Sequence, residues 1–181
     1  MNKPEILKIN EAIEGKFRGI EAEIAACRSA GDLFESLLAA IERSFAIPFV
    51  WLSIIQGPET VRLLRELESS EILGDRLKRI SEGCFLEIMA GEDSPRLANR
   101  DLRPFFRLMP PNRKYFIRSI ALVPLSFHGR LIGSLNHGDP SPDRFQPGMD
   151  TALLRGLAAR ISERLEELMP ADNGADPAAG L

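Results

Sequence analysis

The chain has 181 residues, of which 44% are hydrophobic and 27% charged, a balance typical of one globular domain with short extensions. Its formal net charge is -3 and its basic residues are spread along the chain, so sequence-independent nucleic-acid binding is not expected. Two His and two Cys cannot supply a recognisable four-ligand zinc site, and we expect no metal. No stretch approaches the roughly 20 apolar residues of a membrane span. Because no signal peptide is recognised, we expect a cytoplasmic protein with reduced thiols.

Two helices are predicted at the start of the chain. Pro4 suits a first helical turn, and an apolar stripe then recurs every three or four residues to about residue 28. Its members are Ile6, Ile9, Ile13, Phe17, Ile20 and Ile24. A second helix is predicted to begin at Asp32, with Glu35 completing a capping box, and to end before Pro48. We assign residues 1–30 to an N-terminal helix and 31–169 to the domain itself.

In the middle of the chain, some segments clearly predict one type of secondary structure and others fit two. Residues 49–55 (FVWLSII) predict a strand, because aromatic and β-branched residues lie between Pro48 and Gly57. Residues 59–80 have a helical pattern, although 61–67 could instead form a strand. Residues 84–89 predict a short buried strand. Residues 90–114 are rich in Gly, Pro, Asp and Arg, which indicates a long irregular excursion.

A β-hairpin follows, with strands at 117–126 and 131–137 joined by a turn containing Gly129. A final helix is expected from about Met149 to Met169, ended by Pro170. Residues 170–181 lack core-forming side chains and are expected to be a disordered tail. This order predicts an α+β fold, in which an antiparallel sheet is flanked by helices, with long N- and C-terminal helices.

The two terminal helices carry apolar stripes of similar length, and two interpretations remain open. Both stripes can pack on the sheet, or they can pair with the same helices of a second subunit as a four-helix bundle. The stripe of the last helix consists of Leu154, Leu157, Ala158, Ile161, Leu165 and Leu168. We predict a homodimer formed through the terminal helices.

Two runs of residues carry a family resemblance. Residues 119–138 (SIALVPLSFHGRLIGSLNHG) resemble the hairpin of GAF domains. Residues 141–151 (SPDRFQPGMDT) resemble a run of the GAF-like bacterial proteins grouped as domain-of-unknown-function family 484, except that Ser141 replaces an acidic residue. The resemblance implies an antiparallel sheet with helices on one face and a ligand cavity, roofed by loops, on the other. It also implies dimerisation through the terminal helices.

Candidate ligand-binding residues are polar side chains placed among apolar ones. Trp51 and Ser53 share one face of their strand by alternation, and Arg118, Ser134 and Asn136 are the polar candidates of the hairpin. The arginines of the excursion, with Arg103 and Arg107 as candidates, form either a solvated basic loop or an anion-attracting lid. No cofactor is identified: bilin attachment requires a Cys beside a His, which Cys84 lacks.

Catalysis is not expected from the sequence. Free methionine sulfoxide reductases share the GAF fold but use a cluster of cysteines near the cavity, whereas only Cys84 could face one here. No Gly-rich phosphate loop, GxSxG or HExxH motif occurs. We therefore predict a non-enzymatic sensory or regulatory domain that binds an unidentified small molecule and signals to an unidentified protein partner. The alternative is a protein-interaction scaffold with a filled, ligand-free cavity.

Overall fold

Five strands form a single sheet in the order β2-β1-β5-β4-β3 in the computed structural model, which describes residues 1–171. The strands are β1 (Phe49–Ile55), β2 (Leu77–Ile80), β3 (Arg96–Ala98), β4 (Ser119–Phe127) and β5 (Arg130–Asp139). Every neighbouring pair is antiparallel except β1 and β2, which run parallel. The predicted α+β class is confirmed, with one parallel edge strand added to the antiparallel sheet.

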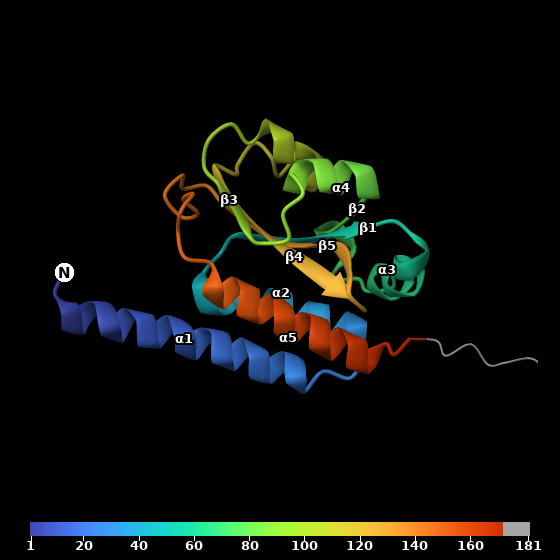
Figure 1. Cartoon of the computed structure of the whole chain (residues 1–181), viewed down its shortest axis with the longest axis horizontal. Coiled ribbons are helices and arrows are strands. Elements are labelled where there is room, and N and C mark those ends of the chain that lie inside the picture. Colours follow the sequence, from blue (N-terminus) through green and yellow to red (C-terminus); the bar gives the residue numbers. More distant parts are fainter. Residues whose placement is uncertain (172–181) are drawn as a thin grey trace, which may run out of the picture.

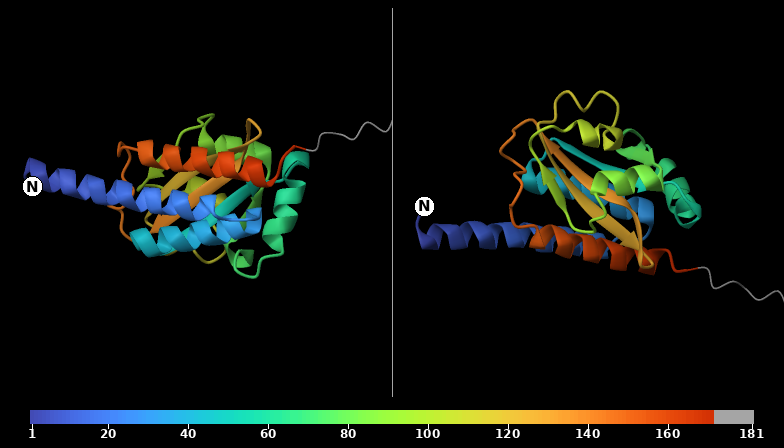
Figure 2. Two further views of the ribbon diagram at one scale, coloured as in Figure 1. Left: turned by 90° about the horizontal axis from the view of Figure 1, so that it is seen from below. Right: turned by 45° about the horizontal axis from the view of Figure 1, so that its top comes forward.

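Three helices lie on one side of the sheet, and the first of them packs mainly on the other two and not on the strands. They are α1 (Lys3–Ala25), α2 (Ala30–Phe45) and α5 (Ala152–Leu168). Figures 1 and 2 show α1 lying between α2 and α5, with its N-terminal half projecting past the sheet. Buried side chains of the three helices meet those of β1, β4 and β5, including Leu37, Leu52, Leu125 and Ile161, in the larger hydrophobic core.

The opposite face is covered by shorter elements from the middle of the chain. Helix α4 (Glu82–Met89), the 3-10 helix η3 (Arg103–Leu108) and the following residues lie over it, and Figure 1 shows them above the sheet. A second core packs Phe85 and Met89 of α4 against Leu108, Ile120 and Leu122. The sheet is thus buried on both faces.

The helix predicted over residues 59–80 is only partly correct. Helix α3 (Val61–Glu68) ends after two turns, and Leu77–Ile80 form β2 beside β1. The helical reading of 61–67 is therefore the right one. Gly74 and Asp75 interrupt the helical pattern, and pairing with β1 outweighs local helix propensity in the residues that follow.

The strand predicted at residues 84–89 is wrong, because these residues belong to α4. Ser81 caps this helix by accepting a hydrogen bond from the Cys84 N–H at 3.3 Å. A short apolar run does not by itself distinguish a buried strand from a buried helix. The start of α2 also differs: Ser29 is the N-cap, and its hydroxyl accepts from the Asp32 N–H at 3.1 Å.

The predicted hairpin is confirmed as β4 and β5. His128 and Gly129 connect the strands, both with positive φ (48° and 73°), as a tight type I′ hairpin turn requires. The excursion of residues 90–114 contains β3 and η3. The predicted tail lies, from residue 172 onward, outside the described residues. Within residues 1–171, none of the helices is both long and apolar enough to cross a membrane.

Candidate functional site

A chain of buried polar side chains crosses the centre of the sheet beneath η3. Ser134 Oγ donates to Asn136 Oδ1 at 2.7 Å, and Asn136 Nδ2 donates to Ser53 Oγ at 2.8 Å. Ser53 Oγ in turn donates to the Leu108 carbonyl at 3.1 Å, and Trp51 Nε1 donates to the same oxygen at 2.7 Å. Trp51 is 2% exposed and the other three side chains are fully buried. We call Trp51, Ser53, Ser134 and Asn136 the polar cluster.

The pairing of β1 with β5 brings these four side chains together. Trp51 lies opposite Asn136, and Ser53 lies opposite Ser134. Residues two apart on a strand point to the same face, so both pairs face η3, as the alternation of β1 predicted. Gly133 permits this register, because a Cβ built there would lie 1.9 Å from the Ser53 carbonyl oxygen.

The space that the family resemblance assigns to a ligand cavity is occupied by side chains of the protein. Phe85, Met89, Leu108, Met109 and Ile117 are buried against the polar cluster's face of the sheet. The expected open cavity roofed by loops is therefore closed in this structure. We call residues 101–116, which include η3, the roof segment.

The three candidate arginines do not join the polar cluster. Arg103 is exposed and pairs with Asp101 at 2.6 Å, and Arg107 pairs with Glu87 of α4 at 3.3 Å. The side chain of Arg118 is exposed just before β4, where its backbone N–H donates to the Asp139 carbonyl at 2.8 Å. In this arrangement Arg103 and Arg107 are each paired with a surface carboxylate and not with the polar cluster.

The Leu108 carbonyl is the part of the site that sequence reasoning missed. It is a backbone group on an irregular segment, so no residue type marks it in advance. It receives two hydrogen bonds from the polar cluster, and it is thereby the acceptor that satisfies two otherwise buried donors. A buried donor without a partner costs about 1–3 kcal/mol, so these contacts hold the roof segment onto the sheet.

The motif at residues 141–151 forms a structural loop on the other face. The ring of Phe145 stacks on that of His137, with centroids 6.0 Å apart, and the Phe145 N–H donates to Ser119 Oγ at 3.3 Å. Arg144 donates to the Phe45 carbonyl. His137 is buried, and its Nε2 has no partner among the described residues. Burial, with a smaller contribution from the positive charge of Arg144, lowers the pKa of His137 from 6.5 to about 4.

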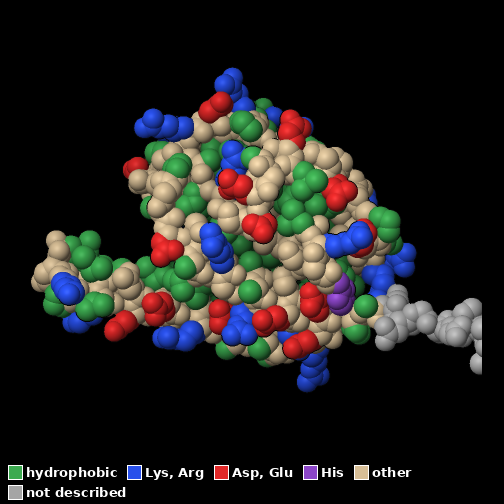
Figure 3. Space-filling view, viewed as in Figure 1, with side chains coloured by type: hydrophobic (Ala, Val, Ile, Leu, Met, Phe, Trp, Pro, Cys, Tyr) green, Lys and Arg blue, Asp and Glu red, His purple; other side chains and the backbone are tan. Residues whose placement is uncertain are grey.

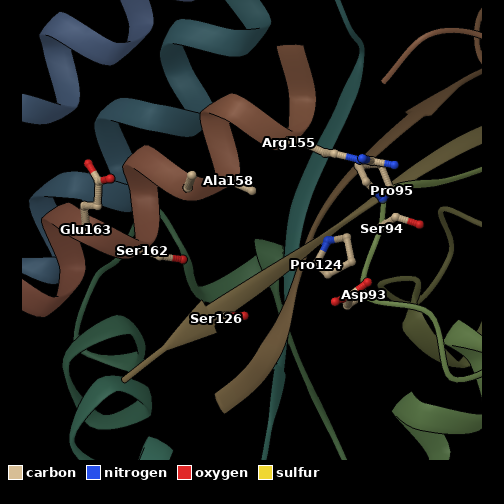
Figure 4. A pocket seen from close by; sticks show the side chains of 10 residues that line it. Asp93, Ser94, Pro95, Pro124, Ser126, Arg155, Ala158, Ser162 and Glu163 are labelled. Carbon is tan, nitrogen blue, oxygen red and sulfur yellow. The ribbon is translucent and has the colours of Figure 1, made fainter. Parts of the chain in front are cut away.

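Other chemistry-bearing features lie away from the polar cluster. A surface hollow of about 680 Å³ lies between α5 and β4, lined by Arg155, Ala158 and Ser162 on one side and Pro124 and Ser126 on the other, as Figure 4 shows. In residues 1–171, no three His, Cys, Asp or Glu side chains gather as a metal ion would require. Cys27 is buried among the helices, whereas Cys84 packs against the core beneath α4.

Comparison with known proteins identifies the family of this fold. The sequence matches the family model of the GAF domain over residues 30–165. The GAF domain of an Acinetobacter phosphoenolpyruvate-protein phosphotransferase is similar in structure, with a TM-score of 0.60 and 15% identity, covering 92% of this chain and 95% of that one. A far-red-absorbing dark-state structure with bound biliverdin has a TM-score of 0.50 and 13% identity, covering 84% of this chain and 96% of that one. None of the curated proteins matches the chain.

One similar structure corrects the expectation that the chain is not an enzyme. The free methionine-R-sulfoxide reductase of Neisseria meningitidis, solved with its substrate, has a TM-score of 0.59 and 19% identity, covering 84% of this chain and 87% of that one. This architecture therefore carries catalysis in at least one protein, and the exclusion of catalysis is overturned. At this identity the likeness is one of fold, and it does not assign the reductase activity. The match over residues 30–165 shows that the chain belongs to the GAF domain family.

Proposed function

We propose that the chain is a sensory domain that binds a small molecule at the polar cluster, in the place now filled by the Leu108 carbonyl. The observation that carries this proposal is the pair of donors, Trp51 Nε1 and Ser53 Oγ, converging on one oxygen atom. A ligand with a carbonyl or carboxylate oxygen satisfies the same two donors when the roof segment lifts. Because the donors remain paired in both states, the exchange avoids the cost of burying them unsatisfied.

Features of the roof segment support such an exchange. Its two aromatic side chains Tyr115 and Phe116 are 76% and 62% exposed, so the closed state buries little of their surface. Residues 111–116 bury no side chain, so this end of the roof segment opens at low free-energy cost, whereas lifting Leu108 and Met109 also costs the burial of their side chains. The bound substrate and biliverdin of two structurally similar proteins are consistent with a ligand-binding role for this fold.

The test is a thermal-shift screen of small metabolites against the wild type, Ser53→Ala and Ser126→Ala. Ser126 is exposed on β4, outside the polar cluster, and is the matched control. A ligand at a hundred times its Kd stabilises the folded state by about 2.7 kcal/mol, or about 5 to 10 °C for a domain of this size. We expect such a shift in the wild type and Ser126→Ala, and a smaller one in Ser53→Ala. Hits that stabilise all three proteins equally would contradict binding at the polar cluster.

We further propose that the domain acts as a homodimer through its projecting helix. In the second half of α1 the apolar stripe is buried at Phe17, Ile20 and Ile24. Ile6 and Ile9 belong to the same stripe in the first half of the helix, but their side chains are exposed. Figure 3 shows hydrophobic side chains gathered on this projection. Three Lys and three Glu between residues 3 and 16 balance in charge, so two copies of this segment do not repel each other.

Light scattering distinguishes this dimer from a monomer in which both apolar stripes pack on the sheet. Ile9→Glu places a charge within the exposed stripe, whereas Ala22→Glu places one on the opposite, exposed side of α1 and is the control. We expect the wild type and Ala22→Glu to have the mass of a dimer and Ile9→Glu that of a monomer. A monomeric wild type would refute the dimer.

We also propose that the chain is a member of domain-of-unknown-function family 484 and that it is cytoplasmic. Residues 141–151 support the kinship, and Cys27 and Cys84, both free thiols, are consistent with a reducing compartment. In this setting, binding that lifts the roof segment would signal to a partner protein through the terminal helices that pack beneath the sheet.

The second candidate function is a protein-interaction scaffold. It is favoured by one observation: side chains fill the face opposite the helices, and the polar atoms of the polar cluster are already paired. In that case Tyr115 and Phe116 would be contact residues for a protein partner. A metabolite screen without a single stabilising compound would favour this scaffold over the sensor.

A further inference from the structure

A small hollow at the margin of the roof segment contains two arginines. It has a volume of about 240 Å³ and lies beside Trp51, with Phe49, Arg76, Pro110 and Arg113 among its lining residues. Trp51 belongs both to this hollow and to the polar cluster. The hollow therefore adjoins the polar cluster at Trp51, whose side chain is 2% exposed.

Arg76 is fixed and largely removed from solvent. Its side chain is 22% exposed, its Nε donates to the Val50 carbonyl at 3.1 Å, and it forms an ion pair with Glu42. Burial, together with the nearby positive charge of Arg113, lowers the pKa of Arg76. Two guanidinium groups thus share a hollow whose lining includes one carboxylate, that of Glu42.

Arg113 carries a positive charge that no carboxylate of the hollow balances. Its guanidinium lies 5.5 Å from the centroid of the Phe49 ring, and across residues 1–171 no carboxylate forms an ion pair with it. Arg103 and Arg107, on the same segment, are each held by a carboxylate. Lys114, the remaining cation of the roof segment, lies over the rings of Phe106 and Tyr115, so Arg113 is the unbalanced charge that lines the hollow beside Arg76.

We propose that Arg76 and Arg113 form the anion-binding end of the ligand site and take a carboxylate or phosphate group of a small organic molecule. The inference rests on the proposed function and names its ligand class. Guanidinium forks match the geometry of both anions, and partial burial weakens screening by solvent. The flat faces of Phe49 and Trp51 favour a planar group beside the charge.

The volume and lining of the hollow limit the size of the bound group and indicate where the rest of the ligand extends. A drug-sized ligand occupies about 300–1,000 Å³, so 240 Å³ holds one small group. A neighbouring hollow of about 640 Å³ shares Pro110 and Arg113 and is lined by Asp75 and Phe116. The anion therefore lies between Arg76 and Arg113, where the ion pair of Arg76 with Glu42 leaves Arg113 to supply most of the attraction, and a larger ligand extends past Arg113.

The test uses phenyl phosphate and benzoate as anionic probes and benzyl alcohol as their uncharged counterpart, at constant ionic strength. Binding is followed by calorimetry and by the fluorescence of Trp51, the single tryptophan of the chain. The variants are Arg113→Gln and the matched control Arg107→Gln. Both side chains are exposed, so thermal unfolding should show both variants to be folded.

We expect either anion to bind the wild type and Arg107→Gln alike, and to bind Arg113→Gln about tenfold or more weakly, since a charge-assisted hydrogen bond is lost. Equal affinity in Arg113→Gln, or no binding of either anion, would overturn the anion site. Binding of benzyl alcohol with Trp51 quenching, in the absence of anion binding, would likewise overturn it while leaving the proposed sensor intact.

Discussion

Removing both partners of the hydrogen bond between Ser134 and Asn136 should cost less than the sum of removing each partner alone. In Asn136→Ala, the Ser134 hydroxyl loses its acceptor, and in Ser134→Ala, the Asn136 carbonyl oxygen loses its donor. Both groups are fully buried, so solvent cannot replace the missing partner. The double variant removes both groups and leaves neither of them unpaired.

The magnitudes follow from these contacts. Each single variant leaves one buried polar group unsatisfied, at about 1–3 kcal/mol. The loss of the Asn136 hydrogen bond to Ser53 is common to Asn136→Ala and to the double variant, so it cancels in the double-mutant cycle. The double variant should therefore be more stable than the sum of the single effects predicts, by a coupling energy of about 1–2 kcal/mol.

Urea unfolding followed by Trp51 fluorescence measures this coupling. Trp51 is buried and is the single tryptophan, so its emission reports exposure of the site itself. The same coupling appears as a difference of about 2 to 8 °C in Tm. Additive effects of the two substitutions, within about 0.3 kcal/mol, would refute the hydrogen-bonded chain.

Two further predictions concern buried His137 and Gly133. The pKa of His137 is about 4 in the folded state and 6.5 in the unfolded state, so the unfolded state binds the proton first as pH falls. The free energy of unfolding should thus be about 2 kcal/mol lower at pH 5 than at pH 7, and His137→Leu should remove most of that difference; an unchanged pH dependence would show that another group titrates. Gly133 has φ of 149°, and its Cβ would meet the Ser53 carbonyl, so Gly133→Ala should cost about 3 kcal/mol or more. Gly129→Ala, in open space at the hairpin turn, should cost clearly less in the same thermal unfolding assay, and equal losses would contradict the steric explanation.

The parts of the fold that the sequence predicts best are set by local patterns. Residues 49–55 lie between Pro48 and Gly57 and form β1 as expected, and the hairpin turn at Gly129 places β4 beside β5. The shared face of Trp51 and Ser53 follows from alternation alone, because a strand has no other way to orient residues two apart.

The remaining features depend on contacts between distant residues. Residues 77–80 become a strand because β1 offers a free edge, and residues 84–89 become a helix because Ser81 caps them. The Leu108 carbonyl enters the site through the path of an irregular segment, which no periodicity encodes. For the same reason, Arg113 reaches the hollow beside Trp51 while Arg103 and Arg107 turn to surface carboxylates.

The central claim, that a ligand replaces the Leu108 carbonyl at the polar cluster, is tested most directly by the indole N–H resonance of Trp51. A single tryptophan gives a single indole cross-peak in a proton–nitrogen correlation spectrum, and this proton is the one donated to Leu108. We predict slow exchange of this proton with solvent in the free protein, and a large chemical-shift change when a stabilising metabolite binds. A metabolite that stabilises the wild type while leaving this resonance unmoved would contradict the account.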